Sequence, residues 1–182
     1  KNSLHGTQGE ITVASYRGHN PLYQHGPLGI TDDHRHFQHA DGTPFFWLGD
    51  TWWKGLCRRL PWQGFQALTA DRQKKGFTVV QIVCGTYPDE LGLLQPSWEN
   101  EGGLPYLNAE FSKVNPDYFK YADRRIEHLI DAGITPAIVG GWGRAVTLNA
   151  VGVSILFSPS VNRPRCASVT VTPMEPCKQP CK

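Results

Sequence analysis

Apolar runs bounded by turn residues alternate with amphipathic segments through the middle of the chain. A turn at residues 41–44 leads into a compact apolar run at 45–48, a β-branched run covers 77–83, and a third run follows at 135–139. Short apolar runs between turn residues predict buried strands. The near-continuous apolar character of the second run is typical of a strand that is covered on both faces.

Two amphipathic segments lie between these predicted strands. The first covers roughly residues 62–75 and has Gly76 as its stop signal. The second begins with Asn115 as N-cap and Pro116 at the first helical position, and it ends at Gly133. The order strand, helix, strand, helix, strand, joined by right-handed crossovers, predicts an α/β fold with a parallel sheet.

The two flanks differ from this core. Residues 1–40 are polar and rich in Gly and His, with short β-like pieces, and they predict a small N-terminal hairpin that leads into the main fold. Residues 158–182 contain five prolines and three cysteines but no aromatic residue, so no strand or helix period continues there. We therefore expect three segments: a lead-in over 1–40, the α/β part over 41–143, and a divergent, disordered tail over 144–182.

Length and charge restrict the function classes. The 182 residues suit one medium domain, or one domain plus a tail, and the formal net charge is +2 at pH 7. A net charge this close to zero does not favour electrostatic binding to nucleic acid or to an anionic membrane. No stretch approaches the roughly 20 apolar residues of a membrane-spanning helix. We therefore expect neither nucleic acid nor a membrane as a partner.

The chain shows no pattern for a metal or a cofactor. His34, His36 and His39 flank a turn, and no acid or cysteine completes a ligand spacing. The pair Cys177 and Cys181 lacks a matching second pair, and the odd count of five cysteines leaves the redox compartment undecided. We expect no metal and no cofactor.

The most informative chemical signal follows the first predicted strand. Asp50, Trp52 and Trp53 come directly after its apolar run. A parallel α/β protein places polar and aromatic groups of this kind in a ligand crevice at the C-terminal ends of its strands. Indole rings stack on the C–H faces of sugars and carboxylates bind their hydroxyls, which indicates a sugar site. The alternative is that both tryptophans cover the end of the sheet and Asp50 caps the following turn.

Several motifs in register resemble one enzyme family. The run 41–53 resembles the opening strand of apiosidase-like glycoside hydrolases (glycoside hydrolase family 140 and relatives). Residues 72–81 are similar to the passage from helix to second strand in that family, and 115–126 with 132–137 are similar to its next helix and third strand. The resemblance spans roughly residues 20–143 in the right order.

The resemblance implies both a fold and an activity. The fold would be a partial (β/α)8 TIM barrel, comprising its first three β/α units, preceded by a short β-rich N-terminal segment. The activity would be hydrolysis of a glycosidic bond in plant cell-wall pectin side chains, notably at apiose, with a carbohydrate as the partner.

The resemblance also implies that the catalytic groups lie elsewhere. The two catalytic carboxylates of the family are expected near the fourth and seventh barrel strands, for which we find no counterpart after residue 143. No residue is therefore assigned a catalytic role. Because glycoside hydrolysis needs two carboxyl groups at a defined separation, we expect an inactive fragment. A barrel cut after three strands would leave an open sheet edge at the third strand, with possible self-association there.

The predicted ligand site lies at the C-terminal mouth of this partial barrel. Its candidate substrate-binding residues are Asp50, Trp52 and Trp53 after the first strand, Gln81 near the end of the second, and Trp142 after the third. Asp50 would bind a sugar hydroxyl and the tryptophans would form a stacking wall. In the alternative interpretation these residues close the end of the barrel.

Among the other acids, several lie in a long loop at about residues 85–114, whose geometry the sequence does not define; they include Asp89, Glu90, Glu99 and Glu101. We expect Glu99 and Glu101 to be solvated loop charges, and Asp123 to be a surface charge on the second helix.

Two other interpretations stay open. One is a non-catalytic carbohydrate-binding or interaction protein on a shortened barrel, and the other is an enzyme assembled from several chains. In the fragment interpretation, residues from about 144 onward resemble a shifted reading frame, a retained intron or an assembly artefact. The compartment is undecided, although the family resemblance favours a secreted or periplasmic protein.

Overall fold

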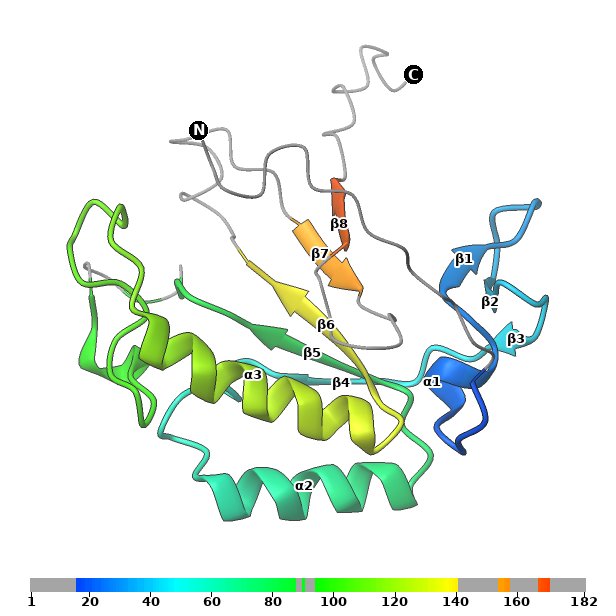
Figure 1. Cartoon of the computed structure of the whole chain (residues 1–182), viewed down its shortest axis with the longest axis horizontal. Coiled ribbons are helices and arrows are strands. Elements are labelled where there is room, and N and C mark those ends of the chain that lie inside the picture. Colours follow the sequence, from blue (N-terminus) through cyan, green and yellow to red (C-terminus); the bar gives the residue numbers. More distant parts are fainter. Residues whose placement is uncertain (1–15, 88–89, 91–93, 141–153, 158–166, 171–182) are drawn as a thin grey trace, which may run out of the picture.

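The computed structural model describes residues 16–87, 90, 94–140, 154–157 and 167–170. Within these residues the chain forms a small N-terminal sheet and a larger mixed sheet that is covered by helices on one face (Figure 1). No helix in the described ranges is both long and apolar enough to span a membrane.

The N-terminal unit is a three-stranded antiparallel sheet in the order β1-β2-β3. Its elements are helix α1 (Pro21–Gln24) and strands β1 (Leu28–Ile30), β2 (Phe37–His39) and β3 (Pro44–Phe45). The expected hairpin is present, but a third strand joins it, so this sheet extends past residue 40. The reason is aromatic packing: the ring of Trp47 lies 5.1 Å from that of Phe37, and Phe45 pairs with Phe37 across the strands.

The larger sheet begins with three parallel strands. They are β4 (Gly49–Trp52), β5 (Val79–Val83) and β6 (Thr135–Val139), in that spatial order. The predicted second and third strands and their parallel pairing are confirmed. The predicted first strand over 45–48 is wrong, because that apolar run is divided: its start belongs to β3, and the parallel strand begins at Gly49.

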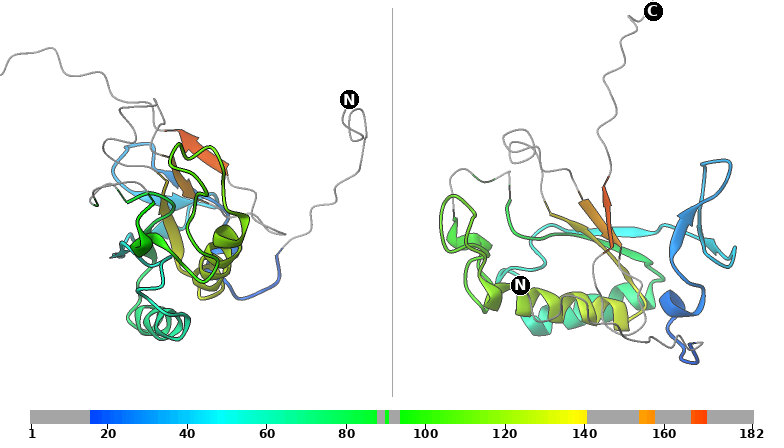
Figure 2. Two further views of the ribbon diagram at one scale, coloured as in Figure 1. Left: turned by 90° about the vertical axis from the view of Figure 1, so that its left-hand side faces the viewer. Right: turned by 45° about the horizontal axis from the view of Figure 1, so that its top comes forward.

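Both predicted helices are confirmed, and both cover the same face of the sheet (Figures 1 and 2). Helix α2 (Trp62–Lys74) ends before Gly76, whose φ of +79° is a conformation that side chains with a Cβ rarely adopt. Helix α3 (Pro116–Asp131) starts at Asn115, whose side-chain Oδ1 accepts a hydrogen bond from the Asp117 backbone N–H at 3.1 Å.

The main hydrophobic core lies between the helices and the sheet. It consists of Trp52, Leu56, Phe65, Val80, Ile82, Tyr118, Ala122, Leu129 and Ile134. Val80 and Ile82 alternate with Gln81 along β5, so the even-numbered positions of this strand face the helices. The residues that face the helices are covered by them, so only the residues on the opposite face or at the strand ends can contact a ligand.

The sheet continues beyond the three parallel strands. Strand β7 (Ser154–Phe157) pairs antiparallel with β6, and β8 (Ala167–Thr170) pairs antiparallel with β7. The expectation of a tail without strands is therefore wrong for these eight residues. The open edge that was expected at the third parallel strand is absent, because β7 covers it. Among the described residues β4 pairs with β5 alone. The self-association that was expected at the third strand stays a prediction.

We predict that Asn115→Ala lowers the free energy of unfolding by about 2–3 kcal/mol, measured by chemical denaturation. The substitution removes the cap of α3, and it also removes the Nδ2 donor to the carbonyls of Gly102 at 2.9 Å and Leu104 at 2.7 Å. Asn115→Ser is the control, because its hydroxyl can keep the cap and it should lose about half as much stability. Equal stability of Asn115→Ala and the native chain would contradict this account.

Candidate functional site

The two adjacent tryptophans at the end of β4 have different surroundings. Trp52 is 6% exposed, and its ring lies edge-on to Phe65 of α2 at 5.2 Å, so it belongs to the core under the helices. Trp53 is half-buried and packs against the second cluster of buried side chains, which includes Tyr87 and Trp98. Because side chains alternate along a strand, Thr51 also faces away from the helices.

Asp50 shares the helix-facing side of β4 with Trp52. Its Oδ2 accepts hydrogen bonds from Trp52 Nε1 at 2.9 Å and from Arg72 Nε at 2.6 Å. Its Oδ1 accepts one from the Thr51 backbone N–H at 2.8 Å. This placement differs from the expected one at the mouth of the barrel, because Asp50 lies inside the strand and is bound to a helix. The substrate-binding roles predicted for Asp50 and Trp52 stay predictions, and these contacts favour a structural role for both.

The environment of Asp50 stabilises its ionised form. Partial burial by itself raises the pKa of the carboxyl, but the hydrogen bonds from Trp52, Arg72 and Thr51, together with the positive charge of Arg72, outweigh it. The net result is a pKa below the usual value of an aspartate. Asp50 is therefore a charged group at neutral pH, held by its neighbours.

Gln81 occupies the middle of β5 on the face away from the helices. In the sheet register it lies between Thr51 of β4 and Ala137 of β6, and it is partly buried. Gln81 thus lies on the side of the sheet that is opposite to Asp50 and Trp52. Trp53, the first turn residue after β4, packs against the second cluster of buried side chains. Trp142, the last predicted binding residue, lies outside the described residues.

A cleft of about 470 Å³ opens beside the end of β4. It is lined by Thr51, Trp52, Trp53, Lys54, Gly55, Arg59, Leu60, Leu68 and Glu90. Most of these residues belong to the segment after the strand, residues 53–61, which we call the β4 loop. The described residues between β5 and α3, which we call the β5 loop, contribute Glu90.

Lys54 and Glu90 join the two loops across this cleft. Their side chains form an ion pair, and the Lys54 side chain is 10% exposed. The Lys54 Nζ also lies 5.3 Å from the ring centroid of Tyr87, a cation–π contact. Glu90 accepts further hydrogen bonds from Ser97 Oγ and, at 2.7 Å, from Trp98 Nε1. The sequence alone did not single out this pair, because its partners are 36 positions apart and one lies in an irregular loop.

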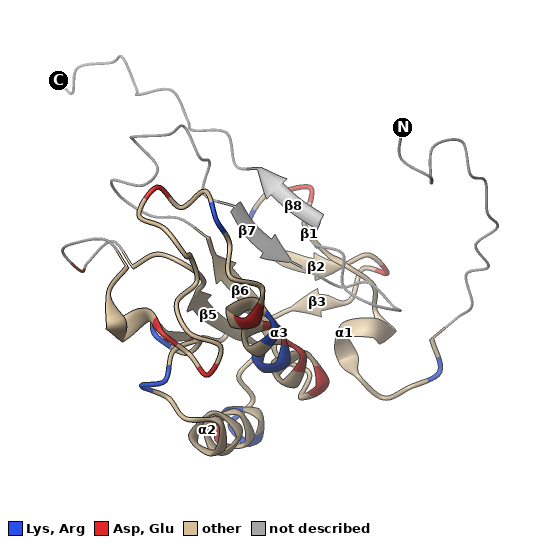
Figure 3. Ribbon diagram, turned by 60° about the vertical axis from the view of Figure 1, so that its left-hand side comes forward, with Lys and Arg blue, Asp and Glu red and all other residues tan. Residues whose placement is uncertain are grey.

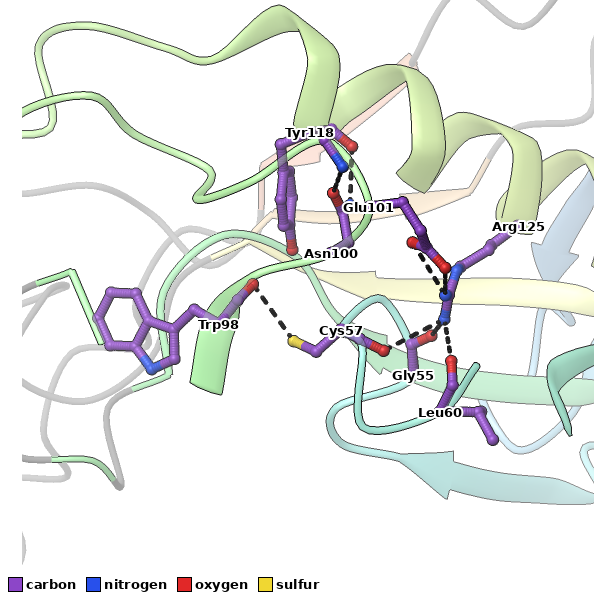
Figure 4. Close-up of polar contacts among 9 residues, drawn as sticks. Gly55, Cys57, Leu60, Trp98, Asn100, Glu101, Tyr118 and Arg125 are labelled. Atoms are coloured by element: carbon purple, nitrogen blue, oxygen red, sulfur yellow. Dashed lines mark hydrogen bonds and ion pairs between the residues drawn. The ribbon is translucent and has the colours of Figure 1, made fainter. Parts of the chain in front are cut away.

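Arg125, from the middle of α3, holds the backbone of the β4 loop (Figure 4). Its side chain is 1% exposed. The Nη1 atom donates to the carbonyls of Gly55 at 2.6 Å and Leu60 at 2.7 Å, and more distantly to that of Cys57 at 3.4 Å. The Nη2 atom donates to both carboxylate oxygens of Glu101, at 2.9 and 3.3 Å. The guanidinium group therefore ties helix α3 to both loops.

Glu101 corrects one expectation from the sequence. It was expected to be a solvated loop charge, but it is the counter-ion of a buried arginine. Glu99 agrees better with the expectation, since its contact with Arg58 spans 3.5 Å and the arginine side chain is 63% exposed. Asp123 is exposed on α3, as expected. Of these two loop acids, Glu101 is paired with a buried arginine and Glu99 with an exposed one.

Cys57 is a further point of contact between the two loops. The fully buried thiol donates to the Tyr87 hydroxyl at 3.0 Å and to the Trp98 carbonyl at 3.5 Å, and Tyr87 in turn donates to the Val83 carbonyl at 3.1 Å (Figure 4 shows the contact with Trp98). Burial raises the pKa of the Cys57 thiol. A protonated, inaccessible thiol of this kind serves packing and is a poor nucleophile.

The charges of the described residues are interspersed and largely paired. Figure 3 shows acidic and basic residues side by side on α3, which fits the small net charge of the chain. Four acids near the cleft and the loops each have a cationic partner: Asp50 with Arg72, Glu90 with Lys54, Glu99 with Arg58, and Glu101 with Arg125. The described residues hold no group of three or more potential metal ligands. The cleft therefore offers an aromatic wall and charged hydrogen-bonding groups.

Comparison with known proteins gives a consistent result. The sequence model of a family described as the apiosidase-like catalytic domain matches residues 31–163. A solved structure described as a glycoside hydrolase is similar with a TM-score of 0.52 and 23% identity, covering 70% of this chain and 28% of its own. A glycoside hydrolase family 5 protein from Bacteroides vulgatus is similar with a TM-score of 0.53 and 24% identity, covering 72% and 28% respectively.

These structural likenesses concern the fold. The chain has an α/β fold with a mixed sheet that resembles part of a glycoside hydrolase barrel, and it spans 28% of the length of both solved relatives. A comparison with functionally curated proteins gave no match. A shared fold does not by itself define a substrate.

We predict that Asp50→Asn lowers the free energy of unfolding by about 1–2 kcal/mol at pH 7, because it removes the charge that Arg72 and Trp52 bind. A carboxyl whose folded pKa is lowered contributes stability above its unfolded pKa of about 3.9, and this contribution is lost as the pH falls through the lower folded value. Denaturant unfolding should be measured between pH 2 and 7. The difference in the free energy of unfolding between Asp50→Asn and the native chain should be constant above about pH 5 and vanish in acid.

Asp123→Asn is the matched control. Burial raises the pKa of the Asp123 carboxyl, so neutralising this acid should not destabilise the chain at pH 7. A pH-independent loss of stability in Asp50→Asn would contradict the proposed electrostatic role of Asp50.

Proposed function

The chain belongs to the apiosidase-like catalytic-domain family, and from this premise we propose that it is part of a glycoside hydrolase whose cleft beside β4 binds a sugar. The proposal rests on one observation above all. Trp53, Lys54 and Glu90 line the same cleft, beside the end of a parallel strand. Barrel enzymes bind their substrates at that end of their strands.

The parallel part of the sheet supports a barrel assignment. We propose that β4, β5 and β6, with α2 and α3 on one face, are the first three β/α units of a (β/α)8 barrel. Their parallel order and the placement of both helices on one face are those of barrel units. The N-terminal segment would be a lead-in and the part after residue 143 a divergent tail, as the sequence predicts, although the N-terminal sheet includes residues up to Phe45.

The cleft has properties that suit a sugar. Its volume of about 470 Å³ falls in the usual range of small-molecule sites, about 300–1,000 Å³. The indole of Trp53 can stack on a sugar C–H face, while Lys54, Glu90 and Thr51 supply donors and acceptors for hydroxyl groups. Family membership favours an apiose-bearing glycoside from a pectin side chain as the ligand.

We also propose that this chain alone does not hydrolyse its ligand. Glycoside hydrolysis uses one carboxylic acid and one carboxylate, separated by about 5–9.5 Å across the scissile bond. Among the described residues that line the cleft, Glu90 is the one acid, and it is ion-paired with Lys54, so the described lining does not supply the required pair of carboxyl groups. The same observation favours a second candidate function, a non-catalytic carbohydrate-binding protein.

We predict that the purified chain binds an apiose-bearing pectin oligosaccharide without releasing sugar. Binding can be measured by calorimetric titration, and turnover by the appearance of reducing ends. Trp53→Ala should weaken binding by about tenfold, because it removes one aromatic face of roughly 1–1.5 kcal/mol. Phe46→Ala, at a side chain that is 74% exposed and lies outside the cleft lining, is the control and should bind like the native chain.

The outcomes separate the candidate functions. Release of sugar by the chain alone would show that the proposal of inactivity is wrong. Release that requires a second protein chain would favour an enzyme assembled from several chains. Absence of binding to every glycan in a panel of plant cell-wall oligosaccharides would contradict the sugar site itself.

A further inference from the structure

Arg125 lies outside the cleft, yet it contacts the backbone of the loop that forms most of it. Three carbonyls of the β4 loop accept hydrogen bonds from its guanidinium group, all within seven positions of Trp53 or Lys54. Glu101 of the β5 loop binds the other side of the same group. A single cation therefore binds both of the loops that Lys54 and Glu90 join (Figure 4).

We propose that Arg125 is a positioning residue, which acts through Glu101 and the three carbonyls to hold the two sides of the cleft in their ligand-binding arrangement. The inference rests on the proposed sugar-binding function of the cleft. Arg125 does not belong to the described lining of the cleft. Its effect on the ligand passes through the backbone of Gly55 and Leu60.

The chemistry of the group supports positioning over simple stabilisation. Burying a cation costs free energy, and a buried ion pair is often no more stabilising than apolar residues of the same volume. A guanidinium group instead offers several donors in a fixed planar fork, which constrains the directions of all its acceptors. The acceptors of Arg125 come from two loops, and Glu101 lies more than 40 positions after each of the three carbonyls in the sequence. The interaction thus restricts their relative placement.

Cys57 provides a probe of this restriction that needs no ligand. Its thiol is fully buried between the loops, and its own carbonyl is one of the acceptors of Arg125. If the loops separate locally, Cys57 becomes accessible to an alkylating reagent while the core strand β5 stays protected. Alkylation at Cys57, located by peptide mass mapping, therefore reports local opening, and amide hydrogen exchange of β5 reports global unfolding.

The decisive variant is Glu101→Gln, which keeps the shape of the side chain and removes the charge opposite Arg125. Arg125→Lys is the second variant, because its single ammonium group cannot form the fork. Arg124→Gln is the matched control: this neighbouring arginine lies over the ring of Trp62 at 4.0 Å and, among the described residues, has no hydrogen bond or ion pair with either loop. Glu101→Gln and Arg124→Gln each remove one charge, whereas Arg125→Lys keeps the charge and replaces the guanidinium group by an ammonium group.

We expect Cys57 in Glu101→Gln to react about tenfold or more faster than in the native chain, with β5 exchange unchanged. Sugar affinity should fall by about tenfold as well, with a smaller or equal loss in Arg125→Lys. Arg124→Gln should match the native chain in both measurements. If Arg125→Lys does not fold, Glu101→Gln decides the question.

Two results would overturn the inference. One is a native rate of Cys57 alkylation in Glu101→Gln, and the other is faster alkylation accompanied by equally faster exchange in β5, which indicates a purely global effect. A native chain that binds no sugar would contradict the proposed function, while the alkylation result would still decide whether Arg125 restrains the loops. Unchanged sugar affinity in a variant with opened loops would contradict the link between Arg125 and the cleft.

Discussion

The buried cation of Arg125 is the constraint on which the arrangement of the loops depends. A guanidinium group that is 1% exposed must find acceptors inside the protein, because the cost of an unpaired buried charge is several kcal/mol. Here those acceptors are carbonyls of Gly55 and Leu60 and the carboxylate of Glu101. The helix, the β4 loop and the β5 loop can satisfy this requirement only together, so the loops adopt defined positions although they have little regular secondary structure.

The elements that were predictable from the sequence are those specified by local signals. Asn115 and Pro116 mark the start of α3, Gly76 and Gly133 follow the ends of the two helices, and the apolar run at 135–139 is strand β6 with the same bounds. In each case the signal and the structure lie within a few residues of one another. The order of strands and helices then leads to a parallel sheet with little ambiguity.

The parts that were not predictable depend on contacts between distant residues. The apolar run at 45–48 has the composition of a strand, but Trp47 packs on Phe37 of the N-terminal sheet. This contact divides the run, and the parallel strand β4 begins only at Gly49. The pairing of Glu101 with Arg125 spans 24 positions and starts in a loop, so no periodicity reveals it. The β-strands after residue 143 have no sequence signal comparable to that of β6.

The division between Trp52 and Trp53 follows from strand geometry once the strand is correctly placed. Strand β4 ends at Trp52, and Trp53 is the first residue of the following turn, so the two indoles have different surroundings although both line the cleft. Trp52 completes the core against Phe65, and this fixes Asp50, two positions earlier, on the same side beside Arg72. Trp53 packs against the second cluster of buried side chains and lines the cleft with Lys54 and Glu90. Asp50, which appears beside the tryptophans in the sequence, therefore binds Arg72 of α2, and the carboxylate that lines the cleft with Trp53 is that of Glu90 from the β5 loop.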